Sequence, residues 1–202
     1  MASSGQVTFS NPLPTGRLRC ALVFQDHGLL PWNSVLENVA IGLEFVGVTR
    51  RERERRAMEF IDQVGLGSFA NHYPHELSIG MRQRVGIARA FVAESDFLLL
   101  DEPFGSLDAQ TKLVLQEELL RIWRDHKRPV IHVTHDIEEA VLLSDRIIVM
   151  SGRPGKVREE VRLTLARPRD PRSIDSPEIS DIRWHIWNIL KEEVRKSLCV
   201  AD

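Results

Sequence analysis

The sequence has few of the features that mark secreted, membrane-embedded or nucleic-acid-binding proteins. Only 2 of its 202 residues are cysteines, and Cys20 and Cys199 show no disulfide framework or metal-ligand spacing, which predicts a reducing compartment. No apolar run approaches the roughly 18 residues that cross a bilayer, and the first residues lack the regions of a signal peptide. The net charge of −2 gives no basic field for nucleic acid. We therefore expect an intracellular protein that reaches a membrane only through a partner.

The sequence also contains no P-loop, the glycine-rich phosphate-binding segment of many nucleotide hydrolases. The pattern Gly-x-x-x-x-Gly-Lys-Ser/Thr needs a lysine directly after a glycine, and only Gly155-Lys156 supplies that pair. Met150 occupies the place of the first glycine there, and Val157 the place of the Ser/Thr. We interpret this segment as a turn.

Apolar patterns predict an α/β fold. Apolar runs of strand length alternate with stretches of helical periodicity, and the strands are too apolar to have one face in water, which indicates a parallel sheet covered by helices. The expected strands are short ones within 5–24, then 97–100, 130–134 and 146–150. The expected helices are 35–45, 50–64, 81–92, 109–126 and 137–143.

This pattern predicts one main domain over residues 1–165, with a helical subdomain at about 33–92. Residues 166–177 are rich in Pro, Arg and Asp and are typical of a surface linker. The remaining residues to 202 contain a terminal amphipathic helix around Ile182–Leu190. We expect that helix to dock onto the body of the protein rather than to bind a partner.

Polar residues follow two of the expected strands at their carboxyl ends. Asp101 and Glu102 end the run Phe97–Leu100, and His135 follows Val130–Thr134. Open α/β sheets bind ligands at that edge. An aspartate there can hold Mg²⁺ beside phosphate oxygens, a following carboxylate can orient or deprotonate a water, and a neutral histidine can donate to a phosphate. Taken singly, the carboxylates can also be a strand leaving the core, and His135 a surface histidine.

Two further segments are open to a functional and a structural interpretation. Ser78-Ile79-Gly80 opens the helix that follows it, and a helix N-terminus can bind an anion or need nothing more than a cap. Gln25 ends a strand and is uninformative by itself. His132 and His135 make a weak metal pair, because residues three apart on a strand point to opposite faces.

Together these residues resemble the nucleotide-binding subunit of ABC transporters. Leu77–Met81 is similar to the signature loop of that family, Leu98–Glu102 to its Walker B strand with the following glutamate, and Ser106-Leu107-Asp108 to its D-loop. Gln25 is similar to the Q-loop glutamine and His135 to the switch histidine.

The resemblance extends from about Ser3 to the terminal helix. The residues around these motifs indicate a subgroup within the family. The segments Val23–Trp32, Asp101–Asp108 and Thr134–Ala140 are most similar to the bacterial importers of nitrate, sulfonates and taurine. The transported solute itself is chosen by an external binding protein and the permease. An ABC ATPase of DNA repair or translation fits less well, since Leu29–Trp32 is similar to the permease-facing loop of importers.

The resemblance implies a P-loop NTPase-like parallel sheet with a helical signature subdomain, and an ATPase of the translocase type that uses ATP and Mg²⁺. The roles it implies are Glu102 as base, Asp101 and Gln25 as ligands of Mg²⁺ and water, His135 as the γ-phosphate contact, and Ser78, Gly80 and Asp108 as parts of the nucleotide site. Ser78 and Gly80 face ATP held by a second ATPase subunit. The resemblance also implies permease subunits and, indirectly, a solute-binding protein as partners, and a peripheral location at the cytoplasmic face of the bacterial inner membrane.

The sequence departs from the family at two places. Ile79 stands where the signature loop has glycine, and a β-branched residue tolerates positive φ poorly. We therefore expect this backbone to approach the γ-phosphate less closely and the signature loop to bind more weakly. The larger departure is the absence of the P-loop (Walker A). The first residues of this sequence resemble the segment that follows the P-loop strand and helix in the family. That strand lies between the ones expected here at 130–134 and 146–150. Without it, buried backbone groups lose partners at about 1–3 kcal/mol each, so we predict an N-terminally truncated sheet and a poor ATPase.

Two other accounts of that departure remain at the level of the sequence. The first is a translation start assigned too far downstream, or a fragmentary gene. An in-frame P-loop motif upstream of Met1 would establish it. The alternative is a non-catalytic regulatory partner that presents Ser78 and Gly80, in trans, to the ATP of an intact subunit.

Overall fold

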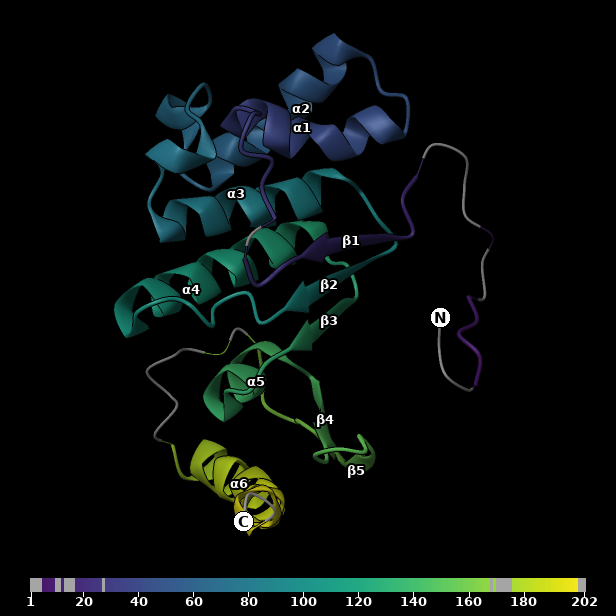
Figure 1. Ribbon diagram of the computed structural model, residues 1–202, viewed down its shortest axis with the longest axis vertical. Helices are drawn as coiled ribbons and strands as arrows, with labels where there is room; N and C mark the ends of the chain where they lie inside the picture. Colours follow the sequence, from purple (N-terminus) through teal and green to yellow (C-terminus); the bar gives the residue numbers. More distant parts are fainter. Residues whose placement is uncertain are drawn as a thin grey trace.

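A three-stranded parallel sheet lies at the centre of the computed structural model, which describes residues 5–9, 12, 17–26, 28–167, 169 and 176–199, with the backbone alone at 192–194 and 196–199 (Figure 1). Its strands are β1 (Cys20–Val23), β2 (Phe97–Asp101) and β3 (Val130–Val133), in that spatial order. The register pairs Cys20 with Phe97 and Leu98 with Val130. The apolar runs form strands because alternate side chains are buried: Leu98 and Leu100 are 0% and 1% exposed.

Two helices follow the strands as the alternation predicts. α4 (Ala109–His126) connects β2 to β3, and α5 (Ile137–Leu143) connects β3 to β4 (Arg146–Met150). Aspartates cap both helices: Asp108 Oδ1 accepts hydrogen bonds from the first turn of α4, and Asp136 Oδ1 does the same for α5. These caps fix where each crossover helix starts, directly after the polar residues at the strand ends.

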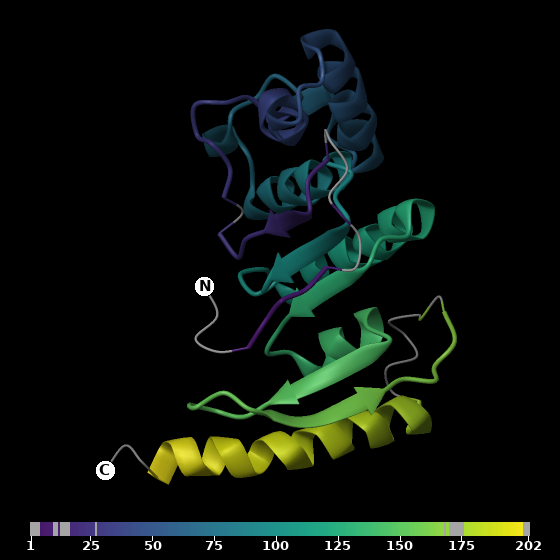
Figure 2. The ribbon, with the colours of Figure 1, turned by 90° about the vertical axis from the view of Figure 1, so that its right-hand side faces the viewer.

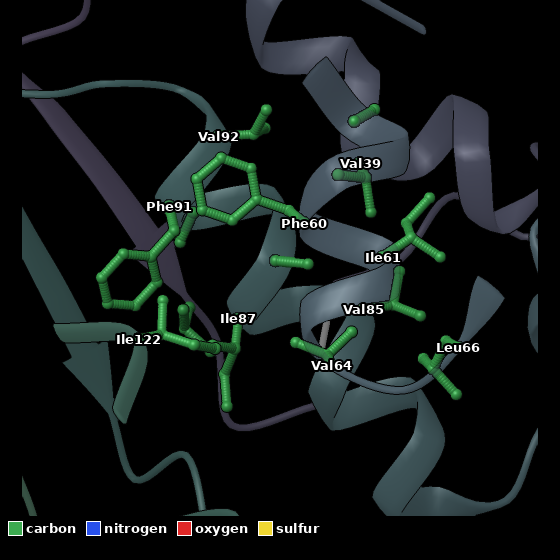
Figure 3. Packing of buried hydrophobic residues seen from close by; sticks show 14 of the residues in the cluster. Val39, Phe60, Ile61, Val64, Leu66, Val85, Ile87, Phe91, Val92 and Ile122 are labelled. Atoms are coloured by element: carbon green, nitrogen blue, oxygen red, sulfur yellow. The ribbon is translucent and has the colours of Figure 1, made fainter. Parts of the chain in front are cut away.

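A helical layer lies beyond β1 (Figure 1). It contains α1 (Val35–Phe45), α2 (Arg50–Gln63) and α3 (Ile79–Val92), with short 3₁₀ turns η1 (Gly67–Phe69) and η2 (Pro74–Glu76). Its apolar faces do not form a separate core. Phe60 and Ile61 of α2 and Phe91 of α3 belong to the same buried cluster as Ile122 of α4 (Figure 3). The helical layer therefore holds the start of α3 in a fixed place relative to the sheet.

β4 belongs to a second sheet, in which it pairs antiparallel with β5 (Val157–Arg162). In the described part of the chain, β3 and β4 are not paired, and their neighbouring apolar side chains stay in water: Ile131 is 55% exposed and Met150 49%. The strand expected at 146–150 is confirmed, but among the described residues it pairs antiparallel with β5 and not with the parallel sheet. The gap between the two sheets falls between β3 and β4, the two strands that the family resemblance separates by a further strand.

The terminal helix α6 (Pro177–Cys199) lies alongside β4 and β5 (Figure 2). Ile179 and Ile186 of α6 are buried with Val141 of α5, Val149 of β4 and Leu163 in a second apolar cluster. The predicted docking onto the body is therefore confirmed, and the helix starts earlier than its apolar residues indicate. No described helix is both long and apolar enough to cross a membrane.

Some predicted elements are not observed, and others lie on residues that the structure does not describe. Of the short strands expected within 5–24, the described residues form only β1. Most of the linker expected over 166–177 lies outside the described residues. The domain division at residue 165 stays a prediction, although the apolar residues group differently, with α5, β4, β5 and α6 around the second cluster.

Candidate functional site

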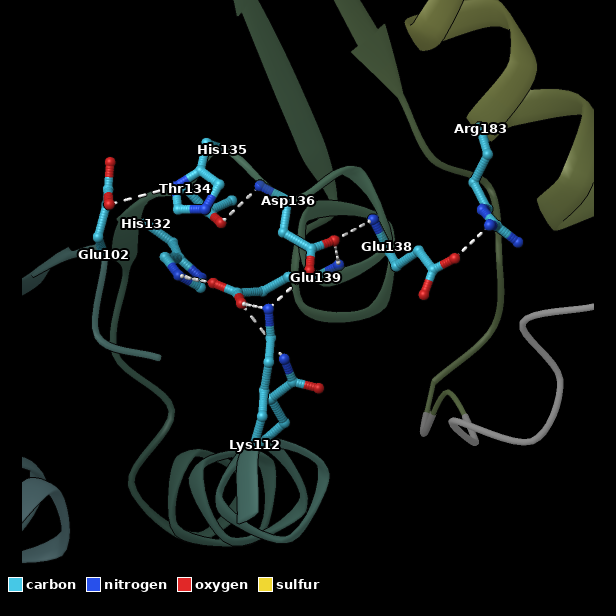
Figure 4. Close-up of polar contacts among 10 residues, drawn as sticks. Glu102, Lys112, His132, Thr134, His135, Asp136, Glu138, Glu139 and Arg183 are labelled. Atoms are coloured by element: carbon cyan, nitrogen blue, oxygen red, sulfur yellow. Dashed lines mark hydrogen bonds and ion pairs between the residues drawn. The ribbon is translucent and has the colours of Figure 1, made fainter. Parts of the chain in front are cut away.

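The carboxyl ends of the three parallel strands bring Gln25, Glu102 and His135 together. The pairing of Val23 with Leu100, continued by two residues, puts Gln25 opposite Glu102. Gln25 Nε2 donates to Glu102 Oε2 over 3.3 Å. His135 Nδ1 lies 3.2 Å from the same oxygen (Figure 4). The prediction that Glu102 and His135 emerge at one edge is confirmed. A carboxylate with an amide on one side and an imidazole on the other can hold a water for attack.

The backbone at Glu102 turns sharply as it leaves β2. Its φ is +44°, a left-handed conformation that side chains other than glycine rarely adopt. Two backbone hydrogen bonds hold it: Glu102 N donates to Val133 O (3.0 Å), and Gly105 N donates to Glu102 O (3.1 Å). Strain of this kind persists where surrounding structure imposes it and clusters at functional sites. The turn aims the Glu102 carboxylate at Gln25 and His135.

Two residues, Phe104 and Asp108, hold the loop that follows Glu102. Phe104 is 1% exposed, and its ring meets the His132 ring edge-on at a centroid distance of 6.1 Å. Asp108 then caps α4 by accepting from Gln110 N (3.1 Å) and Thr111 N (3.0 Å). These hydrogen bonds, the one from Thr111 above all, lower the pKa of Asp108 below its usual range. The described contacts of Asp108 are those of a helix cap, and its place in a nucleotide site stays a prediction.

Ser78 and Gly80 lie at the start of α3, in the helical layer and apart from the strand-end residues. Ser78 Oγ accepts from Met81 N over 3.3 Å, which is the capping role. Ile79 is helical and does not take a positive φ, and its effect on binding by the signature loop stays a prediction. A side chain on Gly80 would come within 3.0 Å of Thr111 Cγ2, so glycine lets α3 approach α4 closely. Ser78 itself is exposed and free to meet a ligand from outside.

A buried ionic cluster lies behind His135 (Figure 4). Glu139 of α5 is 3% exposed, and its carboxylate lies 2.7 Å from both Lys112 Nζ and His132 Nε2. Burial alone would raise the pKa of Glu139, but the contacts with His132 and Lys112 hold it below its usual range. Burial by itself would lower the pKa of Lys112. The hydrogen bonds of Lys112 to Asp136 and Glu139 outweigh that effect, so its pKa lies above the usual range.

The sequence interpretation missed this cluster and Phe104. One signal was present for Glu139, because it sits three residues before Leu142 on the core-facing side of a short helix, where a carboxylate needs a partner. Lys112 and His132 gave no signal of their own, since each is separated from Glu139 along the chain. Their meeting depends on how α4 and α5 pack.

An open hollow of about 520 Å³ lies beside His135. Its walls come from the start of α5 and from α6, with the residues His135, Asp136, Ile137, Glu138, Ser180, Arg183, Trp184 and Trp187. Arg183 of α6 pairs with Glu138 of α5 across it (Figure 4). The terminal helix thus borders the loop that carries His135.

The residues at the strand ends fit a metal held jointly with phosphate. Asp101 is exposed at the end of β2 and offers hard oxygen ligands. Mg²⁺ usually takes one or two carboxylates together with substrate phosphates. In the described part of the chain, no group of three His, Cys, Asp or Glu side chains is arranged to hold a metal by itself. The donor set therefore suits Mg²⁺ that arrives with a nucleotide, with Asp101 and the Gln25 amide oxygen as the candidate ligands.

Comparisons with known proteins identify the family of this chain. A family model described as "ABC transporter" matches residues 2–105. An uncharacterized ABC transporter ATP-binding protein of Methanocaldococcus jannaschii is 50% identical over 88% of this chain and 65% of its own length. Taurine import ATP-binding proteins TauB are 50% identical in Rhizobium johnstonii (84% of this chain, 66% of the relative) and 41% identical in Pseudomonas savastanoi (98% and 78%). The chain thus spans about two thirds of the length of the first two relatives.

Solved structures give the same result. The dimeric structure of the ABC transporter cassette MJ0796 is similar with a TM-score of 0.62 and 35% identity, over 73% of this chain and 63% of the cassette. A post-hydrolysis structure of that cassette bound to ADP and Pi gives a TM-score of 0.61 and 36% identity, over 72% of this chain and 63% of the cassette. Fold, strand-end residues and sequence relatives agree: this chain belongs to the ABC transporter family of ATP-binding proteins.

Proposed function

We propose that this chain supplies the water-positioning part of an ATPase that drives an importer of taurine-like sulfonates or nitrate. The observation that carries the proposal is the convergence of Gln25 and His135 on one oxygen of Glu102, at 3.3 and 3.2 Å. The TauB relatives, whose name is taurine import ATP-binding protein, support the solute class.

In this proposal Glu102 is the general base. Its carboxylate takes a proton from, or orients, the water that attacks the γ-phosphate. His135 contacts a γ-phosphate oxygen, and Gln25 fixes the water and the metal side of Glu102. Bound Mg²⁺ would neutralise the charge on the phosphates, with Asp101 as its carboxylate ligand. The 202 residues hold no P-loop lysine for the phosphates, so we propose that they hydrolyse ATP poorly by themselves.

The assembly follows from the family. The similar cassette MJ0796 is dimeric in its solved structure, and we propose that two ATPase subunits enclose ATP, each presenting Ser78 and Gly80 to the nucleotide of the other. Permease subunits hold this pair at the cytoplasmic face of the membrane, and a solute-binding protein delivers the solute from outside.

The test compares ATP hydrolysis by the purified 202-residue chain with that of the same chain preceded by a P-loop strand and helix from a TauB relative. We expect the extended chain to hydrolyse ATP at a rate typical of its relatives and the 202-residue chain to remain near background. A 202-residue chain as fast as an intact relative would refute the proposed dependence on the P-loop.

A second candidate function is a non-catalytic partner that serves an intact ATPase subunit. Two observations favour it: Ser78 is exposed at the start of α3, and its helix is fully formed without a P-loop. ATP-dependent association of this chain with an intact TauB relative, lost in Ser78→Arg but kept in Glu102→Gln, would support it. The absence of any complex at saturating ATP would remove it.

A further inference from the structure

Lys112 joins the first turn of α4 to the segment that follows β3. Its Nζ lies 2.6 Å from Asp136 Oδ2 and 2.7 Å from Glu139 Oε2 (Figure 4). The lysine side chain is 20% exposed and the Glu139 side chain 2%, so most of this cluster is shielded from water. Gln116, one turn further along α4, donates to the same Glu139 oxygen over 3.4 Å. Two polar side chains of α4 therefore meet at one buried carboxylate of α5.

The two carboxylates that Lys112 contacts also set the backbone around His135. Asp136 directly follows His135, and its Oδ1 accepts from Glu138 N (2.8 Å) and Glu139 N (3.2 Å). Asp136 N donates to Thr134 Oγ1 over 3.0 Å. The chain on the C-terminal side of His135 is therefore held by Asp136, and Asp136 is held by Lys112.

The N-terminal side of His135 is fixed by the same cluster. His132 is on β3, and its Nε2 lies 2.7 Å from Glu139 Oε1. His135 itself is 71% exposed at its side chain, so packing does little to hold the ring. The position of such a ring opposite Glu102 depends on the backbone that carries it.

We propose that Lys112 is a positioning residue for His135: through Asp136 and Glu139 it fixes the segment after β3, so that the imidazole stays opposite Glu102. The proposal rests on the proposed function of His135, and it adds a residue on α4 that touches no substrate. Because α4 starts at the Asp108 cap, one lysine also joins the loop of Asp108 to the loop of His135.

The experiment measures amide hydrogen exchange and His135 ring mobility by NMR in the full 202-residue chain, without nucleotide. The variant is Lys112→Met, which keeps the length of the side chain and removes its charge. Lys112→Arg tests rescue by a cation, and Lys191→Met removes an exposed charge on α6 as the matched control. Asp136→Asn is the milder variant, because an amide oxygen can still cap α5.

In Lys112→Met we expect the amides of Glu138 and Glu139 to exchange at least about 10-fold faster, the size of effect that loss of charge-assisted hydrogen bonds produces. The core amides of Leu99 and Leu100 should change by less than about 3-fold, since local opening does not require global unfolding. The His135 ring should become more mobile, while the ring of His75 in the helical layer stays unchanged. Lys112→Arg and Lys191→Met should match the parent chain.

Equal acceleration at Leu99 and Glu139 would show a purely structural lysine and overturn the proposal, as would an unchanged His135 ring. A kinetic measurement in the P-loop-extended chain separates this failure from failure of the proposed function. There Lys112→Met should lower kcat with little change in KM, and Lys112→Arg should restore it. If the extended chain itself fails to hydrolyse ATP, the proposed function fails while the exchange result stands; if it hydrolyses normally with Lys112→Met, the positioning role falls.

Discussion

Replacing Phe104 by alanine should destabilise the protein more than any comparable change at its surface. Phe104 lies in the loop between Glu102 and Asp108, and its side chain is buried with 1% of its surface exposed. Its ring packs edge-on against the His132 ring. Removal of a buried phenylalanine side chain costs about 3–5 kcal/mol, of which the aromatic pair accounts for about 1 kcal/mol. A loss of 3 kcal/mol multiplies the unfolding constant by more than about 100, against a total stability of about 5–15 kcal/mol for a typical domain.

The assay is urea unfolding of the purified chain, followed by far-ultraviolet circular dichroism at pH 7. Phe45→Ala is the matched control, because Phe45 is 77% exposed at the end of α1 and should change stability by about 0.5 kcal/mol or less. Phe104→Leu keeps most of the volume and should cost less than about 1.5 kcal/mol. Equal losses for Phe104→Ala and Phe45→Ala would refute the reasoning that Phe104 anchors the loop between Glu102 and Asp108.

Three further predictions follow from the same contacts. The pKa values of Asp136 and Glu139 lie below their usual range, so the stabilisation that these carboxylates contribute is present above pH about 4 and is lost as the pH falls further. The urea midpoints at pH 3 and pH 7 should therefore differ less in Lys112→Met than in the parent chain. An unchanged difference would contradict a stabilising role of Lys112 beside the two carboxylates. Ile131 is 55% exposed on β3, the edge strand of the parallel sheet among the described residues, and edge strands tend to pair with other chains. Ile131→Lys should therefore lower any concentration-dependent self-association in sedimentation velocity, with Val114→Lys on α4 as the control and equal effects of both as the contrary result. Lys156→Met in the Gly155 turn should leave ATP hydrolysis by the P-loop-extended chain unchanged, since that turn is not a phosphate loop; a large loss would reverse that interpretation.

Most elements were predictable from the sequence because their boundaries depend on local signals. α1, α4, α5 and β4 have the bounds that the apolar periodicity predicts, and side chains of Ser34, Asp108 and Asp136 cap the three helices. β5 was missed because its sequence, Val157–Arg162, carries charges on both faces and becomes a strand only by pairing with β4. Tertiary pairing there overrides a weak local preference.

The candidate site was predictable to the same degree. Gln25, Glu102 and His135 follow parallel strands, so their meeting at one edge required only the order of the strands. The positive φ of Glu102 and the burial of Glu139 could not be predicted, because each is imposed by contacts between segments distant in the chain. The structure also changes the interpretation of Ile79, which lies in the first turn of α3 without strain.

The proposed ATPase mechanism depends most on Glu102. The measurement that tests it most directly is single-turnover ATP hydrolysis by the P-loop-extended chain and its Glu102→Gln variant, with ATP affinity measured in parallel. The account predicts that Glu102→Gln keeps ATP binding and ATP-bound dimers but slows hydrolysis by at least about 100-fold, the usual contribution of a general base. Hydrolysis by Glu102→Gln at the rate of the parent chain would contradict it.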